Sequence, residues 1–210
     1  MSNEIVNADQ AAAWEKAGPF WLEEQERFDR QADSHGLKAI DAADPSPGEA
    51  VLDIGCGTGT TSFQIAERLG PSGSVVGADI SSTMVDAAKG RAAKASASNV
   101  SFVVADAEVH KHDQPFDLVY SRFGLMFFND RPAAFANIHA ALKPTGRIAF
   151  VSWQSPMKNT WVSAPIQAIN PLLPEPFGAN PDSPGPFNLA NPDKIKELLE
   201  GAGFSSVSLE

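Results

Sequence analysis

The sequence has little cysteine, little positive charge and no long hydrophobic run. Cys56 is the single cysteine among 210 residues, so the chain cannot form an internal disulfide. Lysine and arginine number 16 against 26 aspartates and glutamates, which gives a formal net charge of −10. Nucleic acids and anionic membrane surfaces are bound through basic patches. We therefore expect neither a nucleic acid nor a membrane as a partner.

Targeting and membrane segments are also missing from the printed sequence. No apolar stretch reaches the length needed to cross a bilayer. The N-terminal residues, MSNEIVNADQ, contain no basic segment followed by an apolar one, as a secretory signal would. We predict a cytoplasmic protein, and the length favours a single domain.

Short apolar strands alternate with helices through the middle of the chain. This alternation predicts parallel strands joined by right-handed crossovers, in a doubly wound α/β fold with helices on both faces of a mostly parallel, Rossmann-like sheet. The expected strands lie at residues 50–54, 74–79, 100–104, 116–121 and 147–153. The expected helices lie at residues 60–69, 82–94 and 131–142.

Both flanks of this alternating region have a different character. Residues 11–33 are predicted to be helical with a break near Gly18-Pro19, and a further short helix is expected at 36–43. Nine prolines interrupt residues 154–192, where apolar residues favour an excursion packed over the sheet, with a helix at about 160–170. A last helix is expected at 192–201 and a last strand at 204–209.

The stretch VLDIGCGTGT, residues 51–60, places a glycine-rich loop directly after the first strand. Gly55, Gly57 and Gly59 allow positive φ angles and leave room for a ligand to approach the backbone. Dinucleotide enzymes use the spacing G-x-G-x-x-G, whereas the spacing here is G-x-G-x-G. Asp53 precedes the first glycine, and a carboxylate there suits a cationic ligand better than a pyrophosphate.

Two further acids follow the next strands. Asp79 ends the second strand, where a carboxylate can accept both hydroxyls of a ribose. Asp106 follows the third strand and, with the backbone N–H of Ala107, matches the acceptor and donor edge of adenine. The carboxyl ends of parallel strands meet at one edge of a sheet, so the three acids predict a cleft for a positively charged adenosine derivative.

Residues 50–153 resemble the class I S-adenosylmethionine-dependent methyltransferases, and look closest to the small-molecule branch of ubiquinone and menaquinone methyltransferases. Five segments carry the resemblance: VLDIGCGTGT, VVGADIS, VVADAE, FDLVYSRFGLMFF and LKPTGRIAFVSW. It implies methyl transfer by in-line displacement, with S-adenosylhomocysteine as product. The apolar, proline-rich residues 154–190 and the aromatic N-terminal helix favour a small, partly apolar acceptor rather than a nucleic acid or a protein. The resemblance also implies four parts: an N-terminal helical lid (1–48), a cofactor-binding core (49–153), a substrate-side excursion (154–190) and a last helix and strand (191–210).

The resemblance implies a role for each matching position. The three glycines would pass under the methionine part of the cofactor, whose amino group Asp53 would help to hold. Asp79 would bind the ribose, and Asp106 with Ala107 the adenine. The remaining predicted cofactor residues are Ile80, Met84 and Ser121. The candidate acceptor-side residues are Trp14, Trp21, Arg122 and Phe123, and no general base is assigned.

Some features leave alternatives open. Family members usually have a seventh strand. How the edge of the sheet is completed, and whether a homodimer forms through that edge, therefore stay open. His110-Lys111-His112-Asp113 could suggest a metal site, but lies in a polar loop that we interpret as solvated surface, so we expect no metal. The alternatives to a methyltransferase are a non-catalytic protein that binds S-adenosylmethionine or S-adenosylhomocysteine, and an NAD-dependent dehydrogenase, which the glycine spacing and Asp53 disfavour.

Overall fold

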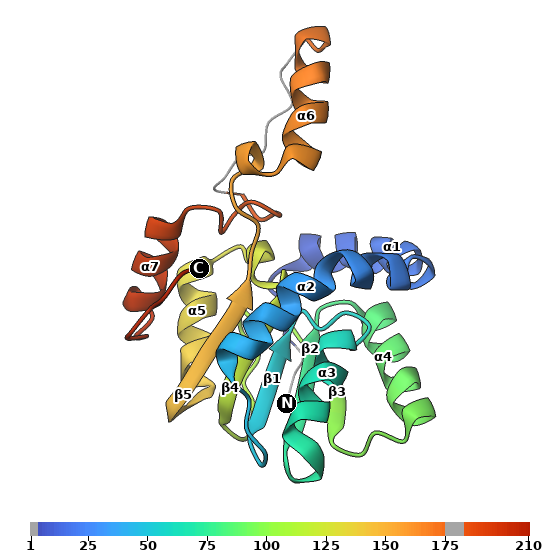
Figure 1. Ribbon diagram of the computed structural model, residues 1–210, viewed down its shortest axis with the longest axis vertical. Coiled ribbons are helices and arrows are strands. Elements are labelled where there is room, and N and C mark those ends of the chain that lie inside the picture. Colours follow the sequence, from blue (N-terminus) through green and yellow to red (C-terminus); the bar gives the residue numbers. More distant parts are fainter. Residues whose placement is uncertain (1–3, 175–182) are drawn as a thin grey trace.

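The computed structural model describes residues 4–174 and 183–210. Its centre is a parallel sheet in the order β3-β2-β1-β4-β5, which confirms the predicted doubly wound fold (Figure 1). The chain reverses its winding direction between β1 and β4, and ligands bind at such switch points in open α/β sheets. The strands are β1 (Ala50–Ile54), β2 (Ser74–Asp79), β3 (Val100–Val104), β4 (Phe116–Arg122) and β5 (Leu142–Val151).

Helices cover both faces of the sheet because successive side chains of each strand point to opposite sides. Val51 packs with residues of α2, α3 and α4 on one face. Leu52, the next residue, packs with residues of α5 and α7 on the other. The helices are α1 (Ala8–Glu23), α2 (Gln25–Ala43), α3 (Thr60–Leu69), α4 (Ser82–Ala95), α5 (Arg131–Ala140), α6 (Thr160–Ile169) and α7 (Pro192–Gly201). None of the helices within the described residues is long and apolar enough to span a membrane.

The N-terminal helices differ from the prediction. The expected break near Gly18-Pro19 is wrong, because α1 continues through both residues and the chain breaks at Glu24 instead. Gly18 serves helix packing, since a Cβ atom on it would lie 2.8 Å from Cγ2 of Thr83 in α4. The short helix expected at 36–43 is the end of the continuous α2. α1 lies toward the carboxyl ends of the strands, whereas α2 runs across one face of the sheet (Figure 1).

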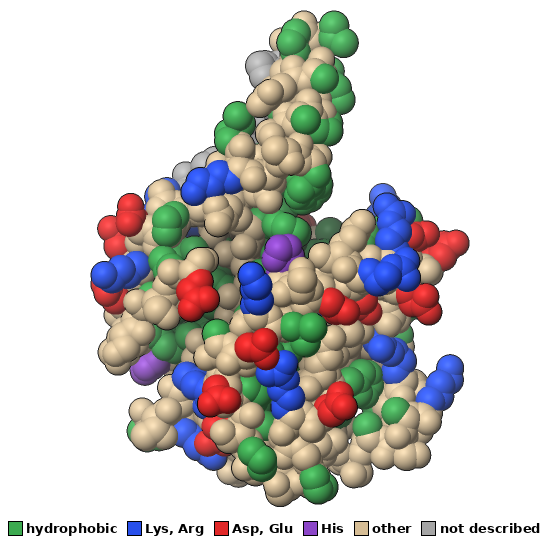
Figure 2. Space-filling view, viewed as in Figure 1, with side chains coloured by type: hydrophobic (Ala, Val, Ile, Leu, Met, Phe, Trp, Pro, Cys, Tyr) green, Lys and Arg blue, Asp and Glu red, His purple; other side chains and the backbone are tan. Residues whose placement is uncertain are grey.

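The proline-rich excursion contains the expected helix, α6, but this helix does not pack over the sheet. It projects away from the body of the protein (Figure 1), and its surface carries exposed apolar side chains (Figure 2). Trp161 is 62% exposed and Leu172 is 82% exposed. Among the apolar residues of this excursion, Phe187 packs in the core, whereas Phe177 lies outside the described residues.

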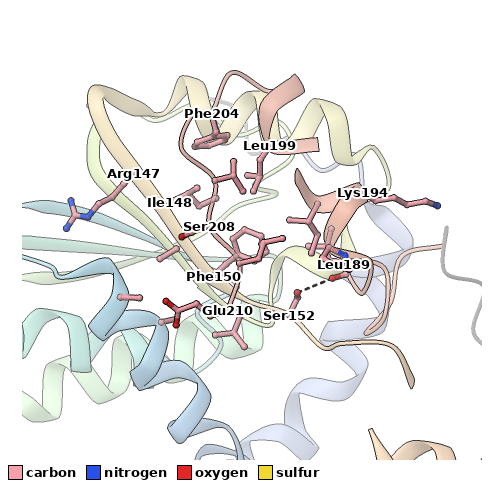
Figure 3. A pocket seen from close by; sticks show the side chains of 18 of the residues that line it. Arg147, Ile148, Phe150, Ser152, Leu189, Lys194, Leu199, Phe204, Ser208 and Glu210 are labelled. Carbon is pink, nitrogen blue, oxygen red and sulfur yellow. Dashed lines mark hydrogen bonds between the residues drawn. The ribbon is translucent and has the colours of Figure 1, made fainter. Parts of the chain in front are cut away.

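The expected last strand at 204–209 is wrong, because this segment has no strand partner among the described residues. A cavity of about 1770 Å³ lies along β5 and is also lined by α7 and by residues 203–210 (Figure 3). The last residues thus line a cavity beside β5, and Phe204 and Val207 are held by apolar packing. β5 also begins at Leu142 and ends at Val151, earlier than predicted.

Candidate functional site

The three predicted acids lie at the carboxyl ends of three neighbouring strands. β1 pairs with β2 and β2 with β3, so Asp53, Asp79 and Asp106 follow one another along the same edge. Asp53 and Asp79 are close enough that the charge of Asp79 helps to raise the pKa of Asp53. The sheet therefore brings together the residues that the sequence placed at one rim.

Asp53 is fully buried and only half satisfied by hydrogen bonds. Its Oδ2 accepts from Thr61 Oγ1 at 2.7 Å and from Ser62 Oγ at 2.6 Å. Its Oδ1 has no hydrogen-bond partner in the part of the chain that the structure describes. Burial raises the pKa of Asp53 to about 6, against the opposing effect of the two hydroxyl donors. A buried acceptor without a donor is costly, and Oδ1 keeps an unused acceptor position.

The glycine loop above Asp53 has the backbone conformation that the sequence predicted. Gly55, Gly57 and Gly59 have φ angles of 68°, 54° and 87°, which side chains other than glycine adopt rarely. A Cβ atom at Gly55 would lie 2.7 Å from the Cα of Gly124, and one at Gly59 would meet the ring of Phe102. A Cβ atom at Gly57 would have nothing within 4 Å. Gly57 is therefore the glycine that borders open space.

Asp79, at the carboxyl end of β2, is hydrogen-bonded to the glycine loop. Its carboxylate accepts from the backbone N–H of Gly57 at 2.8 Å and of Ser81 at 2.9 Å. Desolvation is the largest influence on the carboxyl group and raises the pKa of Asp79. Ile80 is half-buried, and Met84 is buried in the first turn of α4. The sequence did not reveal that Asp79 and Gly57 hold one another.

Asp106 is engaged by the N-terminal segment of the chain. Its carboxylate accepts from the backbone and side chain of Asn7 and from the backbone of Val6, at 2.9–3.0 Å. Asn7 also donates to Glu108 Oε2 at 2.9 Å. The backbone N–H of Ala107 donates no hydrogen bond within the described residues, while its carbonyl accepts from Asn137. Sequence reasoning missed Asn7 and Glu108, although Glu108 belongs to the quoted segment VVADAE.

Ser121 and Arg122 end β4 and have internal partners. The Ser121 hydroxyl donates to the carbonyl of Ile54 at 2.7 Å and so joins the ends of β1 and β4. Arg122 forms ion pairs with Asp29 at 2.7 Å and Asp33 at 2.9 Å, both on α2. Its side chain is 15% exposed. In this structure Arg122 fastens α2 to the sheet rather than facing open space.

We expect Arg122→Ala to lower the free energy of unfolding by about 2 kcal/mol, because it leaves two carboxylates on α2 without their partner in a mostly buried site. Arg27→Ala removes an exposed ion pair with Glu24, also at the start of α2, and should change stability by less than about 1 kcal/mol. Urea unfolding of both variants measures the difference. Equal effects would mean that Arg122 contributes no more than a surface charge.

The candidate acceptor-side aromatics fall into two groups. Trp14 of α1 lies edge-on to Phe127 with ring centroids 5.0 Å apart, and Trp21 stacks on Phe28 at 4.1 Å. Phe123, which has a strained φ of 63°, stacks on Trp153 at 4.3 Å. His35 of α2, which the sequence did not single out, lies edge-on to Phe123 and Trp153. The structure therefore does not bring Trp21 and Phe123 into one cluster.

Glu15 is a further residue that sequence reasoning missed. It lies on α1 and accepts hydrogen bonds from Ser81, Ser82 and Thr83 at the start of α4. The pKa of Glu15 is lowered to about 2, mainly because the Thr83 hydroxyl donates to its carboxylate. The other donors add to this effect, and desolvation opposes it. Glu15 therefore connects α1 to the start of α4, close to Asp79.

The histidine-containing loop is only partly solvated. His112 lies edge-on to Phe116 at 5.1 Å, and burial lowers the pKa of its imidazole to about 4. The interpretation of this loop as solvated surface holds for Lys111 and Asp113, which are exposed, whereas His112 is half-buried. No group of three or more histidine, cysteine or acidic side chains that could hold a metal ion occurs in residues 4–174 and 183–210. Cys56 is buried in the core on one face of the sheet.

Comparison with known proteins gives a consistent result. A family described as a methyltransferase domain matches residues 45–201. The nocamycin O-methyltransferase of Saccharothrix syringae is 32% identical over 179 residues, covering 81% of this chain and 64% of that protein. The ubiquinone/menaquinone biosynthesis C-methyltransferase of Stutzerimonas stutzeri is 35% identical over 172 residues, covering 77% of this chain and 67% of that protein.

A solved structure shows the same arrangement of elements. Phosphoethanolamine N-methyltransferase 2 of Haemonchus contortus, in complex with S-adenosyl-L-methionine, aligns with a TM-score of 0.61 and 25% identity. The alignment covers 81% of this chain and 36% of that one. The chain spans 64%, 54% and 31% of the length of three curated relatives that it matches, about half on average.

Proposed function

The chain belongs to the methyltransferase domain family, and on this basis we propose that it is an S-adenosylmethionine-dependent methyltransferase. The observation that carries the proposal is the unpaired, buried Oδ1 of Asp53 beside a glycine loop that borders open space at Gly57. A carboxylate in this position suits the ammonium group of the methionine part of the cofactor. The missing Cβ of Gly57 leaves room for a ligand against the backbone.

The other rim residues would hold the adenosine part. Asp79 has two carboxylate oxygens with further acceptor capacity beside its bonds to Gly57 and Ser81, and would accept from the ribose hydroxyls. Ile80 and Met84 would pack against the adenine. The N–H of Ala107, which has no acceptor within the described residues, would donate to the adenine ring, and Asp106 would accept from the adenine amino group.

The methyl acceptor is proposed to be a small, partly apolar molecule that binds at the ends of β4 and β5. When bound, S-adenosylmethionine supplies a sulfonium methyl group for in-line displacement, which leaves S-adenosylhomocysteine. The protein then has to align the acceptor and exclude water. The stacked rings of Phe123 and Trp153 offer a flat apolar surface, and His35 beside them offers a polar group. The same His35 and Trp153 are among the residues that line the cavity along β5.

Ligand-dependent melting separates the candidate functions. At a concentration of 100 times Kd, a ligand stabilises a protein by about 2.7 kcal/mol, which corresponds to roughly 5–10 °C for a chain of this size. We expect such an increase in Tm with S-adenosylmethionine or S-adenosylhomocysteine, and none with NAD. An increase with NAD alone would favour the dehydrogenase. Stabilisation by S-adenosylmethionine without product formation from any small, partly apolar acceptor would favour a non-catalytic binding protein.

Location and assembly are proposed from charge and composition. The net charge of −10 and the single cysteine, which is buried, support a cytoplasmic protein that binds neither nucleic acid nor membranes. A homodimer through the edge of the sheet at β5 stays a prediction, which sedimentation analysis of the chain would test.

A further inference from the structure

Residues Val6 and Asn7 occupy the carboxylate that the proposed function assigns to adenine. Asp106 Oδ2 accepts from Val6 N at 3.0 Å, from Asn7 N at 2.9 Å and from Asn7 Nδ2 at 3.0 Å. Its Oδ1 accepts from Asn7 Nδ2 at 2.9 Å and from Glu108 N at 3.1 Å. A carboxylate offers about four acceptor positions. These five contacts leave Asp106 with no free position for the amino group of an adenine.

The N-terminal segment is held by a built polar site rather than by a chance contact. Asn7 is 2% exposed, Asp106 is 2% exposed and Glu108 is 7% exposed. Glu108 Oε2 accepts from Asn7 and from the backbone N–H groups of Asn129 and Asp130. The side-chain oxygen of Asn7 accepts from Asn129 N at 3.1 Å. Every polar atom of the Asn7 side chain therefore has a partner in this site.

We propose that Val6 and Asn7 compete with the adenine of the cofactor for Asp106, so that the adenine subsite opens only when this segment withdraws. The inference rests on the proposed function, because it assumes an adenosine-type ligand at the rim. The apparent affinity for such a ligand is then the intrinsic affinity reduced by the fraction of molecules in which the segment has withdrawn.

The fold provides for withdrawal without loss of α1. Asn7 stands at the N-cap position of α1 but makes no capping hydrogen bond with its side chain. Once released from Asp106, the same side chain can cap its own helix, which offsets part of the lost bonding. Glu15 anchors α1 to α4 about two turns further along the helix. Withdrawal therefore needs only the segment before that anchor to move.

The variant Asn7→Asp tests the competition. A carboxylate at residue 7 would face the carboxylates of Asp106 and Glu108, and the repulsion should drive the segment away. Aspartate is as good an N-cap as asparagine, so α1 should be preserved. The control is Asn191→Asp, the same change at the N-cap of α7, where Asn191 accepts from the N–H groups of its own helix and not from a carboxylate site.

Calorimetric titration with S-adenosylhomocysteine should show a Kd about tenfold lower for Asn7→Asp than for the wild type, and no change for Asn191→Asp. Hydrogen exchange on the wild type adds a second measurement that needs no variant. The amides of residues 6 and 7 should be protected in the free protein and should exchange faster once S-adenosylhomocysteine is bound.

The outcomes separate this inference from the proposed function. If S-adenosylhomocysteine binds the wild type but binds Asn7→Asp equally or more weakly, and residues 6 and 7 stay protected in the complex, the competition is overturned while the cofactor assignment stands. If S-adenosylhomocysteine binds neither protein, the proposed function itself fails. Faster exchange on binding supports the competition even if Asn7→Asp proves too unstable to titrate.

Discussion

Replacement of Asp53 by asparagine is expected to weaken the binding of S-adenosylmethionine by about 2–4 kcal/mol, the range for removing one partner of a desolvated charge pair. Asp53 is fully buried, and its Oδ1 has no partner within the described residues, so a ligand ammonium would provide the missing counter-charge. Asparagine keeps the size of the side chain and removes the charge. Titration calorimetry at pH 7.5 measures the loss.

The same substitution should stabilise the free protein at neutral pH. Burial raises the pKa of Asp53 in the folded state to about 6, above the ordinary aspartate value of 3.8, so the folded state binds the proton more tightly than the unfolded state. Stability from this group is present at low pH and is lost as the pH rises from about 4 to about 6. Above pH 6.5, the free energy of unfolding of Asp53→Asn should therefore exceed that of the wild type by up to about 3 kcal/mol, and this difference should narrow toward pH 4.

The same substitution at Asp117 is a control that should change stability in the opposite direction. Asp117 lies at the start of β4, where it is paired with Lys143, and its pKa is lowered despite desolvation because of hydrogen bonds from Lys143 and Ala50. Asp117→Asn should lower stability at neutral pH and leave cofactor binding unchanged. Unchanged affinity in a folded Asp53→Asn variant would rule out the role assigned to Asp53.

Substitution of Gly57 by alanine is expected to lower cofactor affinity by about 2–3 kcal/mol, because the new methyl group would take space that the ligand occupies. In the free protein this Cβ would meet nothing within 4 Å, so the change creates no internal clash. The positive φ of 54° still costs about 1–2 kcal/mol of stability when an alanine adopts it. Thermal unfolding and titration of the same sample separate the two effects.

Gly48→Ala is the matched control for this backbone cost. Gly48 has a φ of 89°, and its only near neighbour for a new Cβ is Ser72 Oγ at 3.9 Å. It lies in the turn before β1, at the opposite end of that strand from the glycine loop. Both variants should lose similar stability, whereas only Gly57→Ala should lose affinity. Equal affinity in the two variants would contradict a ligand lying against Gly57.

The sequence predicted the sheet and the rim because both follow from short-range patterns. Apolar strands alternating with helices define the doubly wound order, and Asp53, Asp79 and the glycines are placed by the strand ends. The engagement of Asp106 by Asn7 joins residues 99 positions apart, and no local pattern encodes such a contact. The expected strand at 204–209 has strand-like residues, but a strand also needs a neighbouring edge at pairing distance.

The partners of Arg122 and Glu15 illustrate the same limit. Each side chain is ordinary in its local sequence, and its function in the fold depends on which helix the tertiary structure places beside it. Asp29 and Asp33 face Arg122 because they are spaced by one helical turn on α2. The spacing is visible in the sequence, but the approach of α2 to the end of β4 is not.

A crystal structure of the protein with S-adenosylhomocysteine tests the central claim most directly. We expect the ligand at the carboxyl ends of β1, β2 and β3, with its ammonium group within hydrogen-bond distance of Asp53 Oδ1 and its ribose hydroxyls on Asp79. A ligand bound elsewhere, such as in the cavity along β5, with Asp53 Oδ1 still unpaired, would contradict this claim.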